Sequence, residues 1–413
     1  MNTLTTNKNT RPILDGMRVV EASAFVAVPL GGMTLAQLGA DVIRIDPPGG
    51  GLDYRRWPVT ENNTSLFWCG LNKQKRSVVI DVAQAEGREI AMALICAPGD
   101  GAGILLTNLP PRGYLSYEAL CAQRTDLIQL TLSGDRLGGS AVDYTVNPKM
   151  GIPFLTGSGD AQSVVNHVLP AWDLSTGHMA ALGLLAAERH RSRTGEGQHI
   201  RLALEDVGLA MMGHLGFIAE AQSGKARERI NNDLFGAFGR DFLCADGARV
   251  MVVGLTLKQW KALVKATGLQ EAITRLAEQL AVNLNLEGER FRARESIAAL
   301  MAPWLAARNS QQVAAIFNEH GVCWSAYQTV AQLVESDAAC SPANPMFSEL
   351  DQPGVGKILT PGIPLEFSAF DRMPPGPAPL LGQHTEEVLQ GILGMASGEF
   401  GRLVDKGILA CAS

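Results

Sequence analysis

The first third of the chain alternates between short apolar runs and helix-forming segments. Apolar runs rich in β-branched residues predict strands at 17–23, 40–46, 77–82, 103–108 and 126–132. The segments between them predict helices at 28–39, 84–97 and 116–124. Because single helices separate successive strands, the pattern predicts βαβ units and a parallel sheet buried on both faces. The expected fold class is α/β with a Rossmann-like open parallel sheet.

The pattern changes further along the chain. Residues 173–222 predict two helices around a short strand at 197–204. A hairpin turning at 245–247, followed by several helices, then predicts a smaller α+β domain at 223–325. The chain after 326 is rich in Pro and Gly and ends in two predicted helices. A length of 413 residues also exceeds one ordinary core, so at least two domains are expected.

Composition and charge narrow the possible function. The chain is 46% hydrophobic and 18% charged, has a net charge of −6, and contains no basic block that would track nucleic acid. It has no apolar stretch of membrane-spanning length and a polar start, so we expect neither a membrane partner nor a signal peptide. Seven scattered cysteines without a CxxC pair indicate a cytoplasmic location. The histidines are scattered and lack the spacing of metal ligands, so we expect no metal site. The segment "VPLGGM" departs from the GxGxxG pattern, so we expect no dinucleotide site.

One carboxylate stands out in the middle of the chain. Asp173, in "VLPAWDLSTGHMAALGLLAAERH", directly precedes a long run of helix-forming residues. Aspartate is among the best helix N-caps, so a capping role is one interpretation. A helix start also favours an ionised carboxylate, and such a group beside free N–H donors has the properties of a nucleophile. The local sequence leaves both interpretations open.

Two further segments are candidate binding elements. Beside a strand start lie three positively charged residues, Lys73, Lys75 and Arg76. Their side chains are suited to contact phosphate groups, or they could simply face solvent. Open α/β sheets bind ligands at the carboxyl ends of their strands. One predicted strand ends at Thr107, Asn108 and Leu109.

Several segments together resemble the class III CoA-transferases, the formyl-CoA transferase-like family. They are the opening βαβ at 14–46, "LNKQKRSVVIDV", "LLTN", the segment around Asp173 at 171–204, and "PAPLLGQHTEEVL". They occur in order and extend over nearly the whole chain. The resemblance implies an interlocked homodimer in which each protomer threads the other. It also implies that 1–222 and the return segment 326–413 build a large domain, with a small domain at 223–325 between them.

The resemblance implies nucleophilic catalysis by Asp173 on an acyl-CoA. The carboxylate would attack the thioester to give a mixed anhydride, and the CoA thiolate would then attack the aspartyl carbonyl. Four segments, "LAQLGADVIRIDPPGGGLDYRRWPVT", "VDYTVNPKMGIPFLTG", "VNHVLPAWD" and "GAFGRDF", resemble members that keep the released mesaconate and return CoA to its other end. The implied reaction is therefore conversion of mesaconyl-C1-CoA to mesaconyl-C4-CoA. The implied chemistry needs no metal and no cofactor beyond the CoA moiety of the substrate.

Family positions also imply binding residues. Contacts to CoA are implied for Val26, Ala27, Asn72, Lys73, Lys75, Arg76, Thr107, Asn108, Leu109, Asp143 and Tyr144. Many members carry Gln at the position of Val26, so a side-chain role there is in doubt, and Asp143 could instead cap the following loop. Candidates to bind the free carboxylate of mesaconate are Arg55, Arg56, His167 and Arg240. Each arginine could equally form a surface ion pair, and His167 could be structural. Candidate oxyanion donors, or simply turn residues, are Gly236 and Gly239.

The sequence must also be compared with the requirements of three other functions. An intermolecular family member, passing CoA from succinyl-CoA or a similar donor to a separate acid, would share Asp173 and the coenzyme groove. An α-methylacyl-CoA racemase would need an acid–base histidine near Ser140, whereas the first histidine of this chain is His167. A non-catalytic acyl-CoA-binding protein is disfavoured because a carboxylate fills the nucleophile position.

Overall fold

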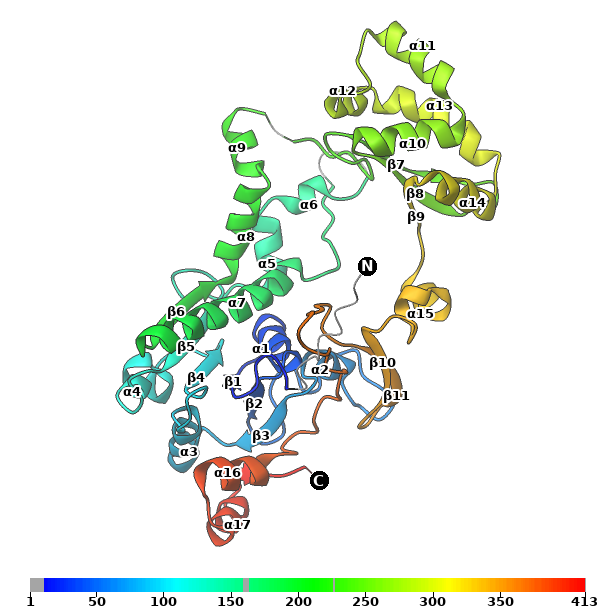
Figure 1. The fold of residues 1–413 in the computed structure, drawn as a ribbon. Helices are drawn as coiled ribbons and strands as arrows, with labels where there is room; N and C mark the ends of the chain where they lie inside the picture. Colours follow the sequence, from blue (N-terminus) through cyan, green and yellow to red (C-terminus); the bar gives the residue numbers. More distant parts are fainter. Residues whose placement is uncertain (1–10, 159–162, 226, 413) are drawn as a thin grey trace. The chain divides into compact units, whose positions relative to one another are not determined.

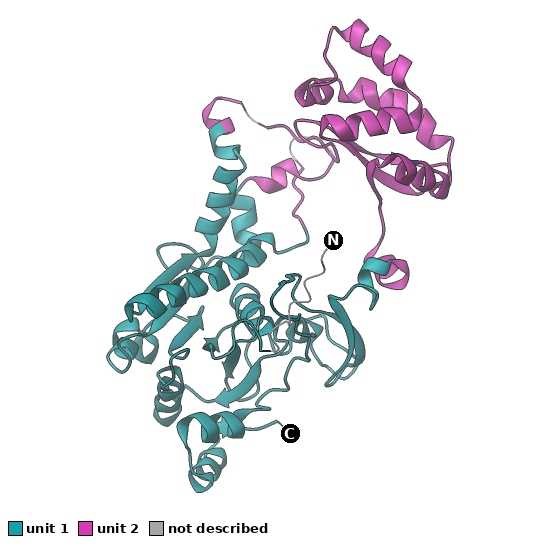
Figure 2. Cartoon of the chain, viewed as in Figure 1, with its two compact units in different colours: residues 1–150, 168–219, 338–413 teal, residues 151–167, 220–337 magenta. Residues whose placement is uncertain are grey.

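The computed structural model describes residues 11–158, 163–225 and 227–412 (Figure 1). Contacts group the chain into two compact units, coloured separately in Figure 2. Unit 1 comprises 1–150, 168–219 and 338–413, and unit 2 comprises 151–167 and 220–337. Residues 151–167, 220–222 and 326–337, which the sequence assigned to the large domain, group with unit 2.

Unit 1 is built on a seven-stranded sheet in the order β12-β3-β2-β1-β4-β5-β6. Its strands are β1 (Arg18–Ala22), β2 (Asp41–Asp46), β3 (Arg76–Ile80), β4 (Ile104–Thr107), β5 (Ile128–Ser133), β6 (Gln198–Ala203) and β12 (Leu409–Ala410). All neighbouring pairs are parallel except β12 with β3. The order 3-2-1-4-5-6 is typical of Rossmann folds, and the predicted α/β class is confirmed.

The edge strand β12 corrects the expectation of a purely parallel sheet. The sequence predicted that the chain ends in two helices, but the second of them, α17 (Ser397–Asp405), is followed by a short strand. Gly407 adopts a φ of 70°, which reverses the chain direction, and Leu409 and Ala410 then pair with Ile80 and Val79. A two-residue strand is too short to show a period in the sequence.

Both faces of this sheet are covered by helices, because alternate strand residues point to opposite sides. Val19 and Leu106 belong to a core shared with α1 (Ala27–Gln37) and α7 (Ala171–Thr194). Val20 and Leu105 belong to a second core on the other face. The helices of that core are α3 (Ala85–Ile95), α4 (Tyr117–Cys121), α16 (Thr385–Leu393) and α17.

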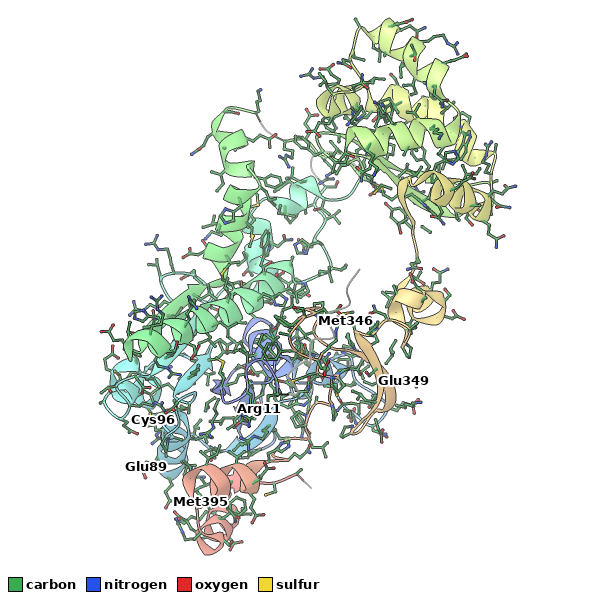
Figure 3. All side chains as sticks on the ribbon, in the orientation of Figure 1. Arg11, Glu89, Cys96, Met346, Glu349 and Met395 are labelled. Carbon is green, nitrogen blue, oxygen red and sulfur yellow. The ribbon has the colours of Figure 1, made fainter. Side chains whose placement is uncertain are left out.

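The second core extends to the chain's C-terminal helices. Figure 3 labels Cys96, which follows α3, and Met395, which follows α16, and both side chains pack against this core. Segments some 300 residues apart in sequence therefore share one hydrophobic core. The last helices complete the layer that the early βαβ units begin.

Unit 2 contains a three-stranded antiparallel sheet in the order β7-β8-β9. Its strands are β7 (Phe238–Leu243), β8 (Arg249–Gly254) and β9 (Cys323–Ala326). Its helices are α10 (Leu257–Thr267), α11 (Gln270–Leu280), α12 (Glu287–Arg292), α13 (Arg294–Ala306) and α14 (Ser310–His320). The predicted hairpin is confirmed, and Gly247 in its turn has a φ of 78°.

The remaining elements are short or lie at the edges of the units. They are α2 (Leu66–Leu71), α5 (Asp143–Lys149), α6 (Ile152–Leu155), α8 (Leu204–His214), α9 (Phe217–Gln222), α15 (Val330–Ser336), the hairpin β10 (Phe347–Gln352) and β11 (Gly356–Pro361), and 3-10 turns at 113–115 and 338–340. Within the described ranges, none of the helices has the length and apolar character needed to cross a membrane. A cytoplasmic location stays a prediction.

Candidate active site

The central strands β1 and β4 end side by side, and their connections leave toward opposite faces of the sheet. Such a switch point is where open α/β sheets bind ligands. Asn108, directly after β4, ties the two loops together. Its side-chain oxygen accepts the Ala24 N–H at 3.0 Å, and its side-chain nitrogen donates to the Ala24 carbonyl at 2.9 Å. Thr107 donates to the Ala22 carbonyl at 2.6 Å, so the turn into α1 is fixed.

The start of α1 faces this switch point. Phe25 has a φ of 68°, a left-handed conformation that is unusual for a bulky residue and is often found at functional sites. Val26 is the N-cap of α1, and Ala27 is the first helical residue. The first-turn N–H groups of a helix have no helical acceptor, so this end of α1 can stabilise an anion.

Two glycines bring α7 close to α1. A Cβ on Gly177 would lie 2.7 Å from the Ala27 carbonyl oxygen, and a Cβ on Gly31 would lie 3.0 Å from the Gly177 carbonyl oxygen. A side chain at Gly177 would clash with backbone oxygen, and one at Gly31 would make a contact tighter than most real Cβ atoms show. Gly177 lies one helical turn after Asp173. The close packing therefore places Asp173 beside the start of α1.

The capping interpretation of Asp173 is wrong. Helix α7 begins at Ala171, with Pro170 as its N-cap, so Asp173 lies within the first turn. The cap comes from another element, since the buried Asp143 carboxylate accepts the N–H groups of Trp172 at 2.8 Å and Asp173 at 3.2 Å. Asp143 thus caps α7 rather than the loop that follows it, and the Asp173 side chain is left for the cavity beside it.

A cavity of about 450 Å³ lies at this point, and Asp173 lines it. Its walls include five predicted coenzyme residues, namely Val26, Ala27, Asn108, Asp143 and Tyr144. The pKa of Asp173 is raised to about 7, mainly by burial and also by the charge of Asp143, while Arg56 opposes the rise. The expectation that a helix start keeps this carboxylate fully ionised is therefore corrected. A poorly solvated carboxylate that ionises near neutral pH is suited to nucleophilic attack.

Other predicted coenzyme residues belong to a buried polar group, here called the Arg44 cluster and comprising Glu21, Arg44, Asp46, Asp53, Asn72 and Lys75. The Lys75 ammonium donates to Glu21 at 2.9 Å and to the Asn72 side chain at 2.9 Å. Burial lowers the pKa of Lys75 to about 8, although the charge of Glu21 opposes that shift. Asn72 also accepts from Arg44, at 3.1 Å, so both predicted residues serve the interior of unit 1.

Arg44 itself was not predicted from the sequence. It is fully buried, binds Asp46 at 3.0 and 3.1 Å and Asp53 at 2.9 and 3.0 Å, and lies 4.5 Å over the Trp68 ring. Burial disfavours its charge, but Asp46, Glu21 and Asp53 together raise its pKa. Its ties to Asp53 fix the loop between β2 and α2.

Several predicted residues lie outside the Asp173 cavity. Arg76 forms ion pairs with Asp41 and Glu387, and Leu109 packs against a core of unit 1. Lys73 is nearly buried, and burial lowers its pKa while Cys69 opposes that shift. Arg55 lines a different cavity, of about 510 Å³.

Three further predicted residues belong to unit 2. Arg240 is paired with Asp233 and Glu295, as the surface ion-pair interpretation would have it. His167 is partly exposed, and Gly236 has a φ of 80° in the turn before β7. Their roles in substrate binding stay predictions.

The apolar walls of the cavity were not predicted from the sequence. They include Phe25, Trp57, Phe67, Leu132 and Pro170, which come from five separate segments of unit 1. These apolar residues belong to no sequence motif. They could have been predicted only from their position beside residues that do. Phe25 directly precedes Val26, and Pro170 lies three residues before Asp173.

Comparison with known proteins bears on this site. A family model described as CoA-transferase family III matches residues 14–385. The chain is 59% identical over 400 residues to the 2-methylfumaryl-CoA isomerase of Chloroflexus aurantiacus, covering 96% of this chain and 98% of that protein. It is 28% identical to the succinyl-CoA:mesaconate CoA-transferase of Haloarcula marismortui, covering 91% and 95%. A CAIB/BAIF family crystal structure from Brucella suis matches with a TM-score of 0.75 and 25% identity, covering 93% of this chain and all of that one.

Proposed function

This chain belongs to CoA-transferase family III, and from that premise we propose that it moves CoA within one molecule, from C1 to C4 of mesaconyl-CoA. The 59% identity to a 2-methylfumaryl-CoA isomerase along nearly the whole chain supports this proposal most strongly. The partly buried Asp173 carboxylate in an apolar cavity supports the same chemistry.

In the first half of the reaction, an Asp173 oxygen attacks the C1 thioester carbonyl. The C1–S bond breaks, CoA leaves as its thiolate, and C1 becomes joined to Asp173 in a mixed anhydride. The thiolate then attacks the Asp173 side-chain carbonyl. The bond between that carbon and the mesaconate oxygen breaks, which gives an aspartyl-CoA thioester and free mesaconate.

In the second half, the C4 carboxylate of mesaconate attacks the same aspartyl carbonyl and releases the thiolate. The thiolate attacks C4 of the new anhydride, and Asp173 leaves as a carboxylate. No proton is removed from carbon, and the reaction needs no cofactor beyond the CoA moiety. The first-turn N–H groups of α1, near Ala27, are suited to stabilise the oxyanions that form at each attack.

Coenzyme contacts are proposed for the residues that share the cavity with Asp173. Val26 and Ala27 offer backbone groups, Tyr144 offers an exposed ring and hydroxyl, and Asn108 holds the loop that forms the wall. Asn72 and Lys75 act indirectly, through the Arg44 cluster. The interlocked homodimer implied by the family is part of this proposal, and its test is the molar mass in solution together with resistance to dissociation on dilution.

The deciding experiment incubates the purified protein with mesaconyl-C1-CoA alone. Mesaconyl-C4-CoA is expected to appear without any added acid, as followed by chromatography of the two regioisomers. If product forms only after succinate, mesaconate or another acid is added, the protein is an intermolecular transferase and the proposal is wrong. Hydroxylamine should displace CoA from the aspartyl-CoA thioester and leave a hydroxamate on Asp173, as judged by mass spectrometry of the tryptic peptide 150–189.

A further inference from the structure

Arg56 provides the positive charge of the Asp173 cavity. Among the described residues that line this cavity, no other lysine, arginine or histidine occurs. The Arg56 guanidinium lies 5.7 Å from the centre of the Phe25 ring and 5.2 Å from the centre of the Phe67 ring. Two aromatic faces therefore hold the cation without neutralising it. A cation in this state is available to a ligand anion.

The backbone of Arg56 is held at both ends. Its N–H donates to the Asp53 carbonyl at 3.2 Å, and its carbonyl accepts the Ser65 hydroxyl at 2.5 Å. Asp53 is buried and binds the Arg44 guanidinium through both carboxylate oxygens, at 2.9 and 3.0 Å. Arg56 is thus placed by a buried ion pair, although its own side chain is exposed. This placement favours a binding role over that of a freely moving surface arginine.

Resting on the proposed function, we propose that Arg56 retains the released dicarboxylic acid and so makes CoA transfer intramolecular. When the thiolate takes the aspartyl carbonyl, the acid fragment carries a carboxylate at each end. A guanidinium can bind one of them through two parallel hydrogen bonds, while the other faces the Asp173 thioester. For the isomer to form, the two carboxylates exchange these places, and the apolar cavity walls allow that turn without hydrogen-bonding either end.

Retention determines which of two outcomes follows. Bound acid turns and receives CoA at its second carboxylate, whereas escaped acid is replaced by whatever acid is in solution. Arg56 therefore acts as a specificity-determining residue, because it changes the ratio of isomerisation to exchange. The acyl-enzyme chemistry itself depends on Asp173.

The test measures both outcomes in one reaction. Mesaconyl-C1-CoA is incubated with excess isotopically labelled mesaconate, and label in the thioester is compared with C4 regioisomer formed. Wild-type protein should isomerise with little label incorporation. Arg56→Gln should raise the ratio of label to isomer by about 10-fold or more, the size expected when a charge-assisted pair is lost. Arg56→Lys should fall between the two, because it keeps the charge but loses the planar fork.

Arg55→Gln is the matched control, because the neighbouring arginine lines a different cavity. Its ratio should equal that of wild type. An unchanged ratio in Arg56→Gln, or an equal rise in Arg55→Gln, overturns the inference. If Arg56→Gln turns over too slowly for the ratio of label to isomer to be measured, the ratio is taken from Arg56→Lys. Single-turnover reactions with stoichiometric Arg56→Gln give the same ratio. If Arg56→Gln and Arg56→Lys both lose isomerisation and form no labelled thioester, the inference is also overturned.

Failure of the proposed function would appear differently. In that case the wild-type protein forms no C4 regioisomer from mesaconyl-C1-CoA alone, whatever the variants do. Isomerisation by wild type, with an unchanged ratio in the variants, would remove only the role of Arg56.

Discussion

Unit 1 places carboxylates in two contrasting environments. In the Arg44 cluster, Glu21, Asp46 and Asp53 are buried against two cations. In the Asp173 cavity, the charges that act on the pKa of Asp173 are a second carboxylate, Asp143, and one opposing arginine, Arg56. The first arrangement satisfies charge and fixes a loop. The second leaves charge poorly compensated, and this is the environment in which a carboxylate becomes reactive.

The contrast predicts that removing the reactive carboxylate affects activity and not folding. Asp173→Ala should lower isomerase turnover by about 10⁴-fold or more, as for other covalent nucleophiles. Its free energy of unfolding at pH 8 should equal or exceed that of wild type, because the fold disfavours the ionised carboxylate. Regioisomer formation and urea denaturation give the two measurements. Retained turnover in a folded variant would contradict the nucleophilic role.

The opposite result is expected in the Arg44 cluster. Arg44→Met should lower the free energy of unfolding by about 3–5 kcal/mol, because it leaves buried carboxylates without their cation. Arg76→Met is the control, since its pairs with Asp41 and Glu387 are partly exposed and each is worth about 0–1 kcal/mol. Equal losses of unfolding free energy in the two variants, measured by urea denaturation, would contradict the claim that buried ion pairs matter more than exposed ones here.

The raised pKa of Asp173 predicts a pH dependence. The value of kcat/KM should fall about 10-fold per pH unit below pH 7, because only the ionised carboxyl is a nucleophile. Between the ordinary value of 3.8 and about 7, the folded carboxyl keeps a proton that the unfolded one has lost. Its contribution to stability therefore declines as the pH rises through that window. A rate profile that stays flat down to pH 5 would contradict the raised pKa.

The smallest effect is expected from Asp143→Asn, which separates the charge of Asp143 from its hydrogen bonds. The amide keeps an oxygen that can accept the N–H groups of Trp172 and Asp173, so the helix cap should weaken by no more than about 1 kcal/mol. The charge that raises the pKa of Asp173 is lost. The acid limb of the rate profile should therefore move to lower pH, with higher relative activity at pH 6. A shift in the other direction would mean that Asp143 acts on Asp173 mainly through its hydrogen bonds.

The alternation of strands and helices could be predicted because most strands of the large sheet, unlike the edge strand β12, are long enough to show their own period. Every predicted strand from β1 to β5 occurs, and the parallel order follows from the helices between them. The edge strand β12 was missed because two residues carry no period. The hairpin of unit 2 was predicted from its turn at 245–247.

The candidate site could be predicted only in part. The family motif picked out Asp173, and the strand-end rule picked out Asn108, because both signals are local in sequence. The motif did not show that Lys75 and Asn72 are buried in the Arg44 cluster, where Lys75 and Arg44 both donate to Asn72. The sequence does not show whether the partner of a charged side chain is water, a ligand or a buried carboxylate.

The sequence by itself determined the α/β class, the succession of βαβ units along the chain and the carboxylate, Asp173, on which the proposed chemistry depends. Only the tertiary structure decided that Asp143 caps α7, that Arg44 anchors the loop of Arg56, and that Arg56 shares a cavity with Asp173. The physical reason is that periodicity and motifs are properties of neighbours along the chain. Burial, charge pairing and pKa depend on residues that folding brings together from distant segments.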